Sequence, residues 1–377
     1  MSLLSSPGSK DTPDRPTPSR TPFRRRGRWP VLFIACVLIV IVAIIGQIFY
    51  QQQTGMIVGR PLASSQTHLH AVVISSQPGI IYLGTHFGLF TSTNDGSTWP
   101  QRQGALNTTM VTSIAVSPTN PAFLAVLAIP TNGGGQQAGV YMSADAGKAW
   151  HFTLPTGLPA TAYPYAIQAA SGTNGHFYTF FSSAGWFETR DLGQHWSAIT
   201  AGSLATLQSP SLLTNDRNPE QLLMGGDQGL FESENDGQSW RQTTALGGSV
   251  LALTGTQPTG NDTTRTVLCA TDQGLYRGLE QHSQIVWHAV HMPAVASPTR
   301  LVMNADGSIL YALFGSDLWF SGDQGTTWVH RWHFARSDMV ALVLNPHNPQ
   351  EVVAGFFWPG LVLRSTNQGI SWQTLTH

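Results

Sequence analysis

The amino-acid sequence predicts an all-β fold, a ring of seven four-stranded blades, preceded by one transmembrane helix. The composition is the first of three observations behind this prediction. The 377 residues include 38 glycines and 23 prolines but only 10% charged residues, which favours a turn-rich β protein over a helical one. The second is an octapeptide ending in tryptophan that recurs six times along the chain. The third is a single long uncharged stretch near the N-terminus.

The N-terminal segment, residues 1–29, is rich in serine, proline, threonine and arginine, a composition typical of disordered chain. Residues 1–50 carry seven basic side chains against two acidic ones, a net charge of +5, and the rest of the chain carries −6. A mildly acidic body argues against nucleic acid as a partner. We expect the basic tail to orient the helix that follows, with contact to anionic lipid as the alternative.

Residues 30–50 form the predicted transmembrane helix. These 21 residues carry no charge, and as an α-helix they would extend about 31 Å, enough to cross the hydrocarbon core. The basic cluster at residues 24–28 precedes them and none follows, so we expect a cytoplasmic N-terminus and residues 51–377 outside a cell membrane. A cleaved signal peptide is the alternative, but residues 46–50 offer no small-residue cleavage site.

The chain has two cysteines, Cys36 in the apolar run and Cys269 in a strand-like stretch. This pair predicts no disulfide, and no metal site can be built from thiolates alone. The residues before Cys36 match a lipoprotein signal poorly, so we do not expect a lipid-anchored cysteine.

Residues 51–66 are predicted to be a linker, because their Gly, Pro and Gln content suits a flexible stalk; an extra strand is the alternative. Residues 67–377 hold the repeats. The repeated octapeptide has Ser or Thr first, Asp or Asn third, Gly fifth and Trp eighth. We name its six copies the box turns, at residues 92–99, 143–150, 189–196, 233–240, 321–328 and 365–372.

The box turn has a physical logic. An Asp or Asn side chain accepts hydrogen bonds from backbone amides in a tight turn, and a hydroxyl two residues earlier donates to that side chain. Glycine supplies a positive φ, and the tryptophan buries a large ring between neighbouring sheets. We therefore assign a structural role to Asn94, Trp99, Asp145, Trp150, Asp191, Trp196, Asn235, Trp240, Asp323, Trp328, Asn367 and Trp372.

A seventh repeat fills the one doubled interval. The tryptophans of the box turns are 51, 46, 44, 88 and 44 residues apart, and Trp287 divides the interval of 88 into 47 and 41. Residues 271–276 also copy residues 226–231 at the matching place, so this repeat has lost only its turn. Strand-like runs such as residues 71–74, 80–84 and 88–90 flank each turn and predict four antiparallel strands per repeat.

The box turns resemble Asp-box, or BNR, repeats. On these motifs residues 66–377 look like a seven-bladed β-propeller of the sialidase, sortilin and xyloglucanase-like superfamily, and are similar to the photosystem II assembly and stability factor propellers. The resemblance implies a fold more than a function, because the families that share it do unrelated things. A sialidase would need a cluster of three arginines, for which the chain offers Arg60, Arg217, Arg265, Arg277, Arg300 and Arg336.

In a four-stranded meander the box turns join the third and fourth strands and lie at one end of the ring. The turns between the second and third strands, with the links between blades, lie at the other end, where propeller loops commonly carry function. The candidate binding residues there are His86, Phe87, Asp227, Asp272, Asp317 and Trp358. The alternative role for the aspartates is turn formation.

We expect a membrane-anchored, extracytoplasmic binding or assembly scaffold, of bacterial origin, whose partner is a membrane-protein complex or a cell-surface glycan. No catalytic residue and no cofactor are assigned. The alternative is a sialidase- or xyloglucanase-like glycoside hydrolase, which needs two carboxylates about 5–10 Å apart and would take them from Asp227, Asp272 and Asp317. No metal site is expected, since the histidine groups 282, 288, 291 and 330, 333 fit no common zinc spacing.

Overall fold

The computed structural model describes residues 67–100, 106–131, 137–170, 175–200, 202–257, 264–281, 284–292 and 297–375, and the backbone of residues 56–57 and 101–102. The predicted tail and transmembrane helix, residues 1–50, lie outside this set. Among the described residues no helix has the length and apolar character needed to cross a membrane. The membrane span and its orientation therefore stay predictions.

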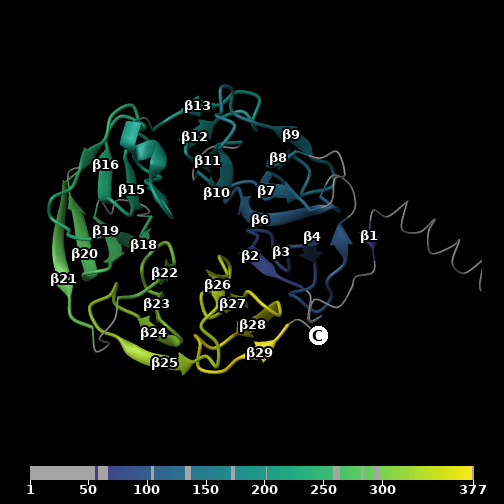
Figure 1. The fold of residues 1–377 in the computed structure, drawn as a ribbon. Coiled ribbons are helices and arrows are strands. Elements are labelled where there is room, and N and C mark those ends of the chain that lie inside the picture. The colour runs from purple at the N-terminus through teal and green to yellow at the C-terminus, as the bar shows by residue number, and fades with distance from the viewer. Residues whose placement is uncertain are drawn as a thin grey trace, which may run out of the picture. The chain divides into compact units, whose positions relative to one another are not determined.

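Residues Thr54–His377 form one compact unit, in which seven antiparallel sheets surround a central opening (Figure 1). Blade 1 contains β2 (Leu69–Ile74), β3 (Ile81–Thr85), β4 (Gly88–Ser92) and β5 (Gln101–Arg102). Blade 2 contains β6 (Thr109–Val116), β7 (Leu124–Pro130), β8 (Gly139–Ser143) and β9 (His151–Thr153). Blade 3 contains β10 (Tyr163–Ala169), β11 (Phe177–Ser182), β12 (Gly185–Thr189) and β13 (Ser197–Ala198).

After the short 3₁₀ helix η1 (Gly202–Thr206), blade 4 contains β14 (Ser211–Thr214), β15 (Leu222–Gly226), β16 (Gly229–Ser233) and β17 (Arg241–Gln242). Blade 5 contains β18 (Val250–Gly255), β19 (Arg265–Thr271), β20 (Gly274–Gln281) and β21 (Gln284–Val290). Blade 6 contains β22 (Arg300–Met303), β23 (Leu310–Phe314), β24 (Asp317–Ser321) and β25 (Val329–His333). Blade 7 contains β26 (Met339–Leu344), β27 (Val352–Phe356), β28 (Leu361–Ser365) and β29 (Gln373–Thr374). The prediction of a seven-bladed β-propeller is confirmed.

The core consists of apolar side chains that fill the spaces between neighbouring blades. All five residues of β3 and of β27 are buried, because neighbouring blades cover both faces of these inner-sheet strands. Leu83 and Phe90 of blade 1 pack with Val353 and Val362 of blade 7, so the first and last blades meet through a core of the same kind as the others. The Leu69 N–H also donates to the Phe357 carbonyl over 2.9 Å.

Each blade of four strands comes from one continuous stretch of chain, and the ring closes by packing of blade 7 on blade 1. One short strand is added to this scheme. β1 (Met56–Ile57) pairs antiparallel with β5 at the outer edge of blade 1. For residues 51–66 the sequence left a stalk or an extra strand open, and the structure has a strand at residues 56–57.

The six box turns share one conformation and one hydrogen-bond pattern. The first hydroxyl donates to the Asp or Asn side chain over 2.7–3.1 Å and accepts the glycine N–H over 2.8–2.9 Å. Glycine is required at the fifth position, since its φ lies between 77° and 84° in all six turns. The residue before it also has a positive φ, of 55° to 60°, which the sequence analysis did not foresee.

The tryptophans of the box turns pack between neighbouring blades. The indole N–H of Trp240 donates to the Ile199 carbonyl of blade 3 over 2.7 Å, and that of Trp99 to the Leu375 carbonyl of blade 7 over 3.1 Å. The indole N–H groups of Trp328 and Trp372 instead donate to the glycine carbonyl of their own turn. The indole N–H of Trp196 donates to the Thr153 hydroxyl of blade 2 over 3.0 Å, whereas that of Trp150 has no hydrogen-bond partner among the described residues. Five of the six half-buried indoles are therefore hydrogen-bonded either to the adjoining blade or to their own turn.

Blade 5 replaces the box turn with a longer hairpin, β20 and β21, and with a buried ion pair. The Arg265 guanidinium is 2% exposed and lies 3.4 Å from the Glu280 carboxylate, which is 8% exposed. The guanidinium also donates to the carbonyl of Thr214 in blade 4. The seventh repeat is therefore confirmed. Arg265, paired with Glu280, links blade 5 to blade 4 at the end of the blade where the other blades have a box turn.

Candidate functional site

The two ends of the ring differ in chemistry. The box face carries the box turns. We name the other end the loop face; it carries the links between blades and the turns between second and third strands, described at residues 86–87, 183–184, 227–228, 272–273, 315–316 and 357–360. The inner strand of every blade starts at the loop face, because its first residues pair with the end of the second strand.

A bulge near the start of the inner strand recurs in five blades. In blades 1, 2, 3, 5 and 7 one residue of the inner strand has no Cα partner in the second strand, and these extra residues are His70, Thr112, Tyr165, Leu251 and Val340. A bulge bends the strand and re-aims the side chain at that position. Tyr165 and Leu251 are exposed, and the other three are half-buried.

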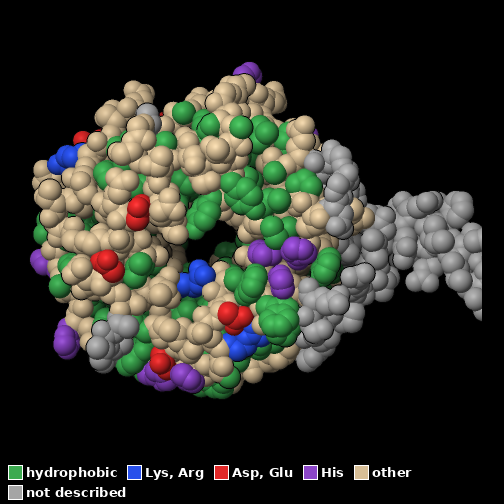
Figure 2. Space-filling model, viewed as in Figure 1, with side chains coloured by type: hydrophobic (Ala, Val, Ile, Leu, Met, Phe, Trp, Pro, Cys, Tyr) green, Lys and Arg blue, Asp and Glu red, His purple; other side chains and the backbone are tan. Residues whose placement is uncertain are grey.

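Apolar side chains are consequently exposed around the central opening (Figure 2). The described residues include nine exposed large hydrophobic side chains, and five of them belong to inner-strand starts or loops of the loop face. These five are Tyr163, Tyr165, Leu251, Phe357 and Trp358. An exposed apolar patch of this kind is typical of a binding surface.

An imidazole and aromatic cluster lies where blade 1 meets blade 7. The His68 ring stacks on Phe357 with ring centroids 4.8 Å apart, and lies edge-on to Trp358 at 6.2 Å. His70 and His86 complete the group, with their ring centroids 5.6 to 6.4 Å from each other and from His68. Figure 2 shows the histidine side chains gathered beside the opening, over β2 and β3.

The three histidines bring potential metal-ligating nitrogens together. One ring nitrogen from each of His68, His70 and His86 lies within 4.8 Å of the other two, and all three side chains are half-buried. Burial, with smaller effects from His86 and His68, lowers the pKa of His70 from 6.5 to about 4. Nε2 of His70 is buried and has no hydrogen-bond partner in the described structure.

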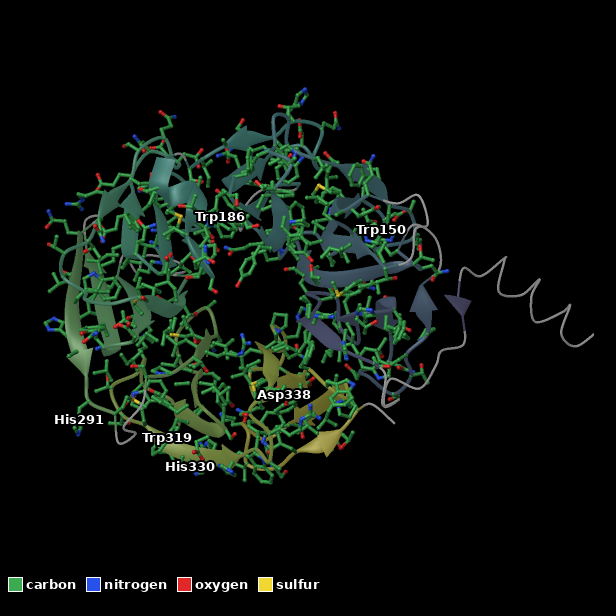
Figure 3. All side chains as sticks on the ribbon, in the orientation of Figure 1. Trp150, Trp186, His291, Trp319, His330 and Asp338 are labelled. Carbon is green, nitrogen blue, oxygen red and sulfur yellow. The ribbon has the colours of Figure 1, made fainter. Side chains whose placement is uncertain are left out.

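The turn that carries Trp358 is held in place by one ion pair. Arg336 Nε donates to Asp338 Oδ1 over 2.8 Å, and the same guanidinium donates to the carbonyls of Trp358 and Pro359. Asp338 Oδ2 accepts the Trp358 N–H over 3.0 Å. Hydrogen bonding to Arg336 lowers the pKa of the Asp338 carboxyl, so this side chain is ionised and fixed. Asp338 directly precedes β26, the inner strand of blade 7, and is labelled over that blade in Figure 3.

Three of the residues singled out from the sequence meet in this cluster. Phe87 lies edge-on to His86 with centroids 5.6 Å apart, and His68 bridges His86 to Trp358. His68, His70 and Phe357 were not singled out. A signal was present for two of them, since His68 and His70 alternate directly before the predicted first strand.

Asp227 and Asp272 lie in matching turns of blades 4 and 5 and bind backbone groups. The Asp227 carboxylate accepts the Gln208 N–H over 2.7 Å, and the Asp272 carboxylate accepts the Ser249 N–H over 3.2 Å. Ser249 also donates its hydroxyl to the Asp227 carbonyl over 3.0 Å. Both carboxylates thereby tie a turn to the preceding link between blades, which is the turn-forming role considered above.

Asp317 is the first residue of β24 and stands apart from the opening. Its Oδ1 lies 2.9 Å from Nε2 of His330 and 2.8 Å from Nδ1 of His333, both on the outermost strand of blade 6. Figure 3 shows His330 at the outer rim of the ring. The structure therefore does not bring Asp317 together with His86, Phe87 and Trp358.

Three of the six arginines that the sequence offers for a sialidase-like site are engaged in local contacts. Arg265 lies in the buried pair of blade 5, and Arg300 donates twice to the Met339 carbonyl. Arg336 is bound to Asp338 and to the turn beside it. Each of these guanidinium groups stabilises local structure.

A cavity of about 700 Å³ opens at the other end of the central opening. The last residues of the inner strands β2, β22 and β26 and the polar loops after them line it, among them Ile74, Met303, Asp306, Leu344 and Asn345. Because inner strands end at the box face, this cavity is separate from the histidine and aromatic cluster.

The chain is similar in overall fold to several solved propellers. With the GH74 xyloglucanase from Xanthomonas campestris the TM-score is 0.63 at 14% identity, over 84% of this chain and 56% of the enzyme. With YCF48 from Cyanidioschyzon merolae the TM-score is 0.56 at 16% identity, over 80% of this chain and 96% of YCF48. With U3-55K the TM-score is 0.55 at 12% identity, over 79% and 91% of the two chains.

At these identities the likeness establishes the fold alone. The expected resemblance to xyloglucanase-like propellers and to photosystem II assembly and stability factor propellers is confirmed at that level. The chain spans little more than half the length of the xyloglucanase. No protein-family model and no curated protein matches the chain. Function has to be argued from the residues of this chain.

Proposed function

We propose that this protein is a membrane-anchored binding scaffold whose loop face docks a protein partner outside the membrane. One observation carries the proposal: the exposed apolar and aromatic side chains of the described residues concentrate around the central opening on that face. Aromatic side chains are enriched where protein interfaces are buried, and they supply much of the binding energy there.

The arrangement of the loop face supports a preformed interface. The turn with Phe357 and Trp358 is fixed by Arg336 and Asp338 before any partner arrives, so little ordering is needed on binding. The charges of Arg336 and Asp338 neutralise each other, so this pair adds no net charge beside Phe357 and Trp358.

The membrane anchor is the second part of the proposal. Support comes from the uncharged stretch at residues 30–50 and from the arginines directly before it, which favour a cytoplasmic N-terminus. This topology places the propeller outside the membrane, where it meets the exposed parts of membrane proteins. Protease added to intact cells is expected to degrade the propeller and to leave residues 1–29 protected.

We do not propose glycoside hydrolysis. Its two catalytic carboxylates would have to face each other across a substrate. Asp227 and Asp272 instead bind backbone amides, and Asp317 binds two histidines at the outer rim.

Site-specific photo-crosslinking in the native membrane tests the interface. A photoreactive phenylalanine analogue replaces Trp358 or Tyr165 on the loop face, and Ile370 or Val286 elsewhere on the ring, in the full-length chain. The positions are matched, since Trp358 is 52% exposed and Ile370 is 55% exposed. We expect one discrete protein adduct from Trp358 and Tyr165 and none from Ile370 and Val286.

Three results would overturn the proposed protein interface. Adducts confined to Ile370 and Val286 would place the partner on another surface. Equal adducts from all four positions would mean non-specific contact. Loop-face positions that give no protein adduct, together with retention of the chain on immobilised cell-envelope glycan, would make the partner a glycan.

A second variant tests whether Trp358 contributes to the same interface. Substitution of Trp358 by alanine is expected to weaken the adduct from Tyr165 without lowering the melting temperature.

A further inference from the structure

We propose that His68, His70 and His86 form a binding site for a divalent transition-metal ion of the zinc class. The site lies on the loop face, in blade 1, beside the central opening. It is independent of whether the face binds a protein, since all three ligands belong to this chain. No metal site was expected from the sequence, and the histidines weighed for one were residues 282, 288, 291, 330 and 333.

The local fold brings the three side chains to one point. His68 directly precedes the inner strand β2 and His70 is its second residue; their ring centroids lie 6.4 Å apart, while Leu69 between them is buried in the core. His70 is the extra residue of the bulge in blade 1. His86 comes from the turn between β3 and β4, and its N–H donates to the His68 carbonyl over 3.0 Å.

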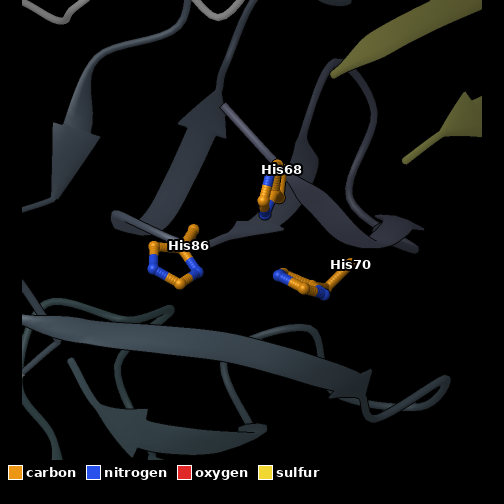
Figure 4. A group of neighbouring side chains, drawn as sticks. All are labelled: His68, His70 and His86. Carbon is orange, nitrogen blue, oxygen red and sulfur yellow. The ribbon is translucent and has the colours of Figure 1, made fainter. Parts of the chain in front are cut away.

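The distances suit a metal ion after a small adjustment of the rings. The three candidate nitrogens lie within 4.8 Å of one another, and Figure 4 shows the rings arranged around a common centre. Zinc binds imidazole nitrogen at about 2.0–2.1 Å, so tetrahedral ligands lie about 3.4 Å apart. Each nitrogen has to move by only about 1 Å to reach that spacing.

A second observation points to a ligand at this place. Nε2 of His70 is buried without a hydrogen-bond partner among the described groups. A buried ring nitrogen of this kind is unfavourable unless something binds it. A metal ion at the centre of the three rings supplies that partner.

The donor set defines the class of ion. Three imidazoles without a carboxylate suit zinc, copper or nickel and do not suit calcium or magnesium, which prefer oxygen ligands. Three protein ligands leave a fourth coordination position, which is typical of zinc sites that bind water or an exogenous donor. Because the three histidines are only half-buried, that position is reachable from the loop face.

Zinc titration of the full-length chain, purified without a histidine tag, tests the site. Calorimetry is expected to give one Zn²⁺ per chain, and bound Co²⁺ is expected to show the intense visible bands of four-coordinate geometry. His70→Gln should weaken Zn²⁺ binding by more than roughly 100-fold, because losing a residue that only hydrogen-bonds to a metal ligand already costs roughly 10- to 100-fold in affinity. His68→Gln and His86→Gln should do the same.

The chain offers a matched control. His330 and His333 are exposed histidines that both contact Asp317, so they are a second group of neighbouring histidines in the same chain. The double variant His330→Gln with His333→Gln should keep the full Zn²⁺ affinity and the visible spectrum of Co²⁺. Unchanged binding in the triple variant of His68, His70 and His86, or loss of binding in the control, overturns the proposal. Melting curves without metal show whether each variant is folded.

Discussion

Substitution of Glu280 by glutamine is expected to destabilise the propeller by about 3 kcal/mol. Glutamine keeps the size of the side chain but removes its charge, and Arg265 is left as a buried cation. Removing one partner of a buried ion pair typically costs about 3–5 kcal/mol. The cost should lie at the lower end of that range, because Arg265 keeps hydrogen bonds of 2.5 Å and 3.2 Å to the carbonyls of Thr214 and Thr256.

The loss converts to a shift in melting temperature. At roughly 2.1 cal/mol/K per residue, a propeller of about 300 residues has an unfolding entropy of about 0.65 kcal/mol/K. A loss of about 3 kcal/mol then lowers the melting temperature by about 5 °C. Circular dichroism on the full-length chain, recorded at one scan rate for all variants, measures this shift.

A matched ion pair serves as the control. Arg241 and Glu232 are 3.0 Å apart, closer than Arg265 and Glu280, but the Arg241 side chain is 75% exposed. Glu232→Gln should therefore change stability by about 1 kcal/mol or less. A larger loss from Glu232→Gln than from Glu280→Gln would refute the reasoning that burial, and not distance, makes the pair in blade 5 important.

Two further predictions concern the box turns and the loop face. Trp240→Ala should lower the free energy of unfolding by about 2–4 kcal/mol, because the packing of the ring and its hydrogen bond to the Ile199 carbonyl are lost. The loss should be smaller than for a fully buried tryptophan, since the ring of Trp240 is half-buried. An unchanged urea midpoint would contradict this prediction. Arg336 holds the pKa of Asp338 below its usual 3.8, so this carboxylate stabilises the fold fully above about pH 4 and loses that effect as the pH falls through its lower folded value. Melting temperatures between about pH 5 and pH 3 should fall more in the parent chain than in Asp338→Asn, and parallel curves would contradict this.

Much of the fold could be predicted because each repeat specifies its own blade. The box turn encodes its hydrogen bonds within eight residues, as from Ser92 to Trp99, and the strands on either side pair with chain neighbours. Even the repeat without a box turn was recognisable from Trp287 and from the copied turn at residues 271–276, because the spacing of the repeats persists where the box turn is lost. The Arg265–Glu280 pair was not foreseen, since its members are 15 residues apart and gain meaning only when both are buried.

The candidate site was predictable in part. The order of strands in a meander assigns His86, Phe87 and Trp358 to one end of the ring, and the structure places them there. The order of strands does not predict that His68 and Phe357 join this group, because their contact forms only when blade 7 packs against blade 1. Asp317 does not join the group, because it pairs with His333 on the outermost strand of blade 6.

The sequence by itself determined what depends on neighbours in the chain: the number of blades, the turns, and the end of the ring on which each loop lies. The tertiary structure decided which side chains from different loops meet, and which are buried. The physical reason is the range of the interactions. A turn such as residues 92–99 is stabilised within one hairpin. His68 and Phe357 are far apart in the sequence, and they meet only because the first and last blades pack against each other.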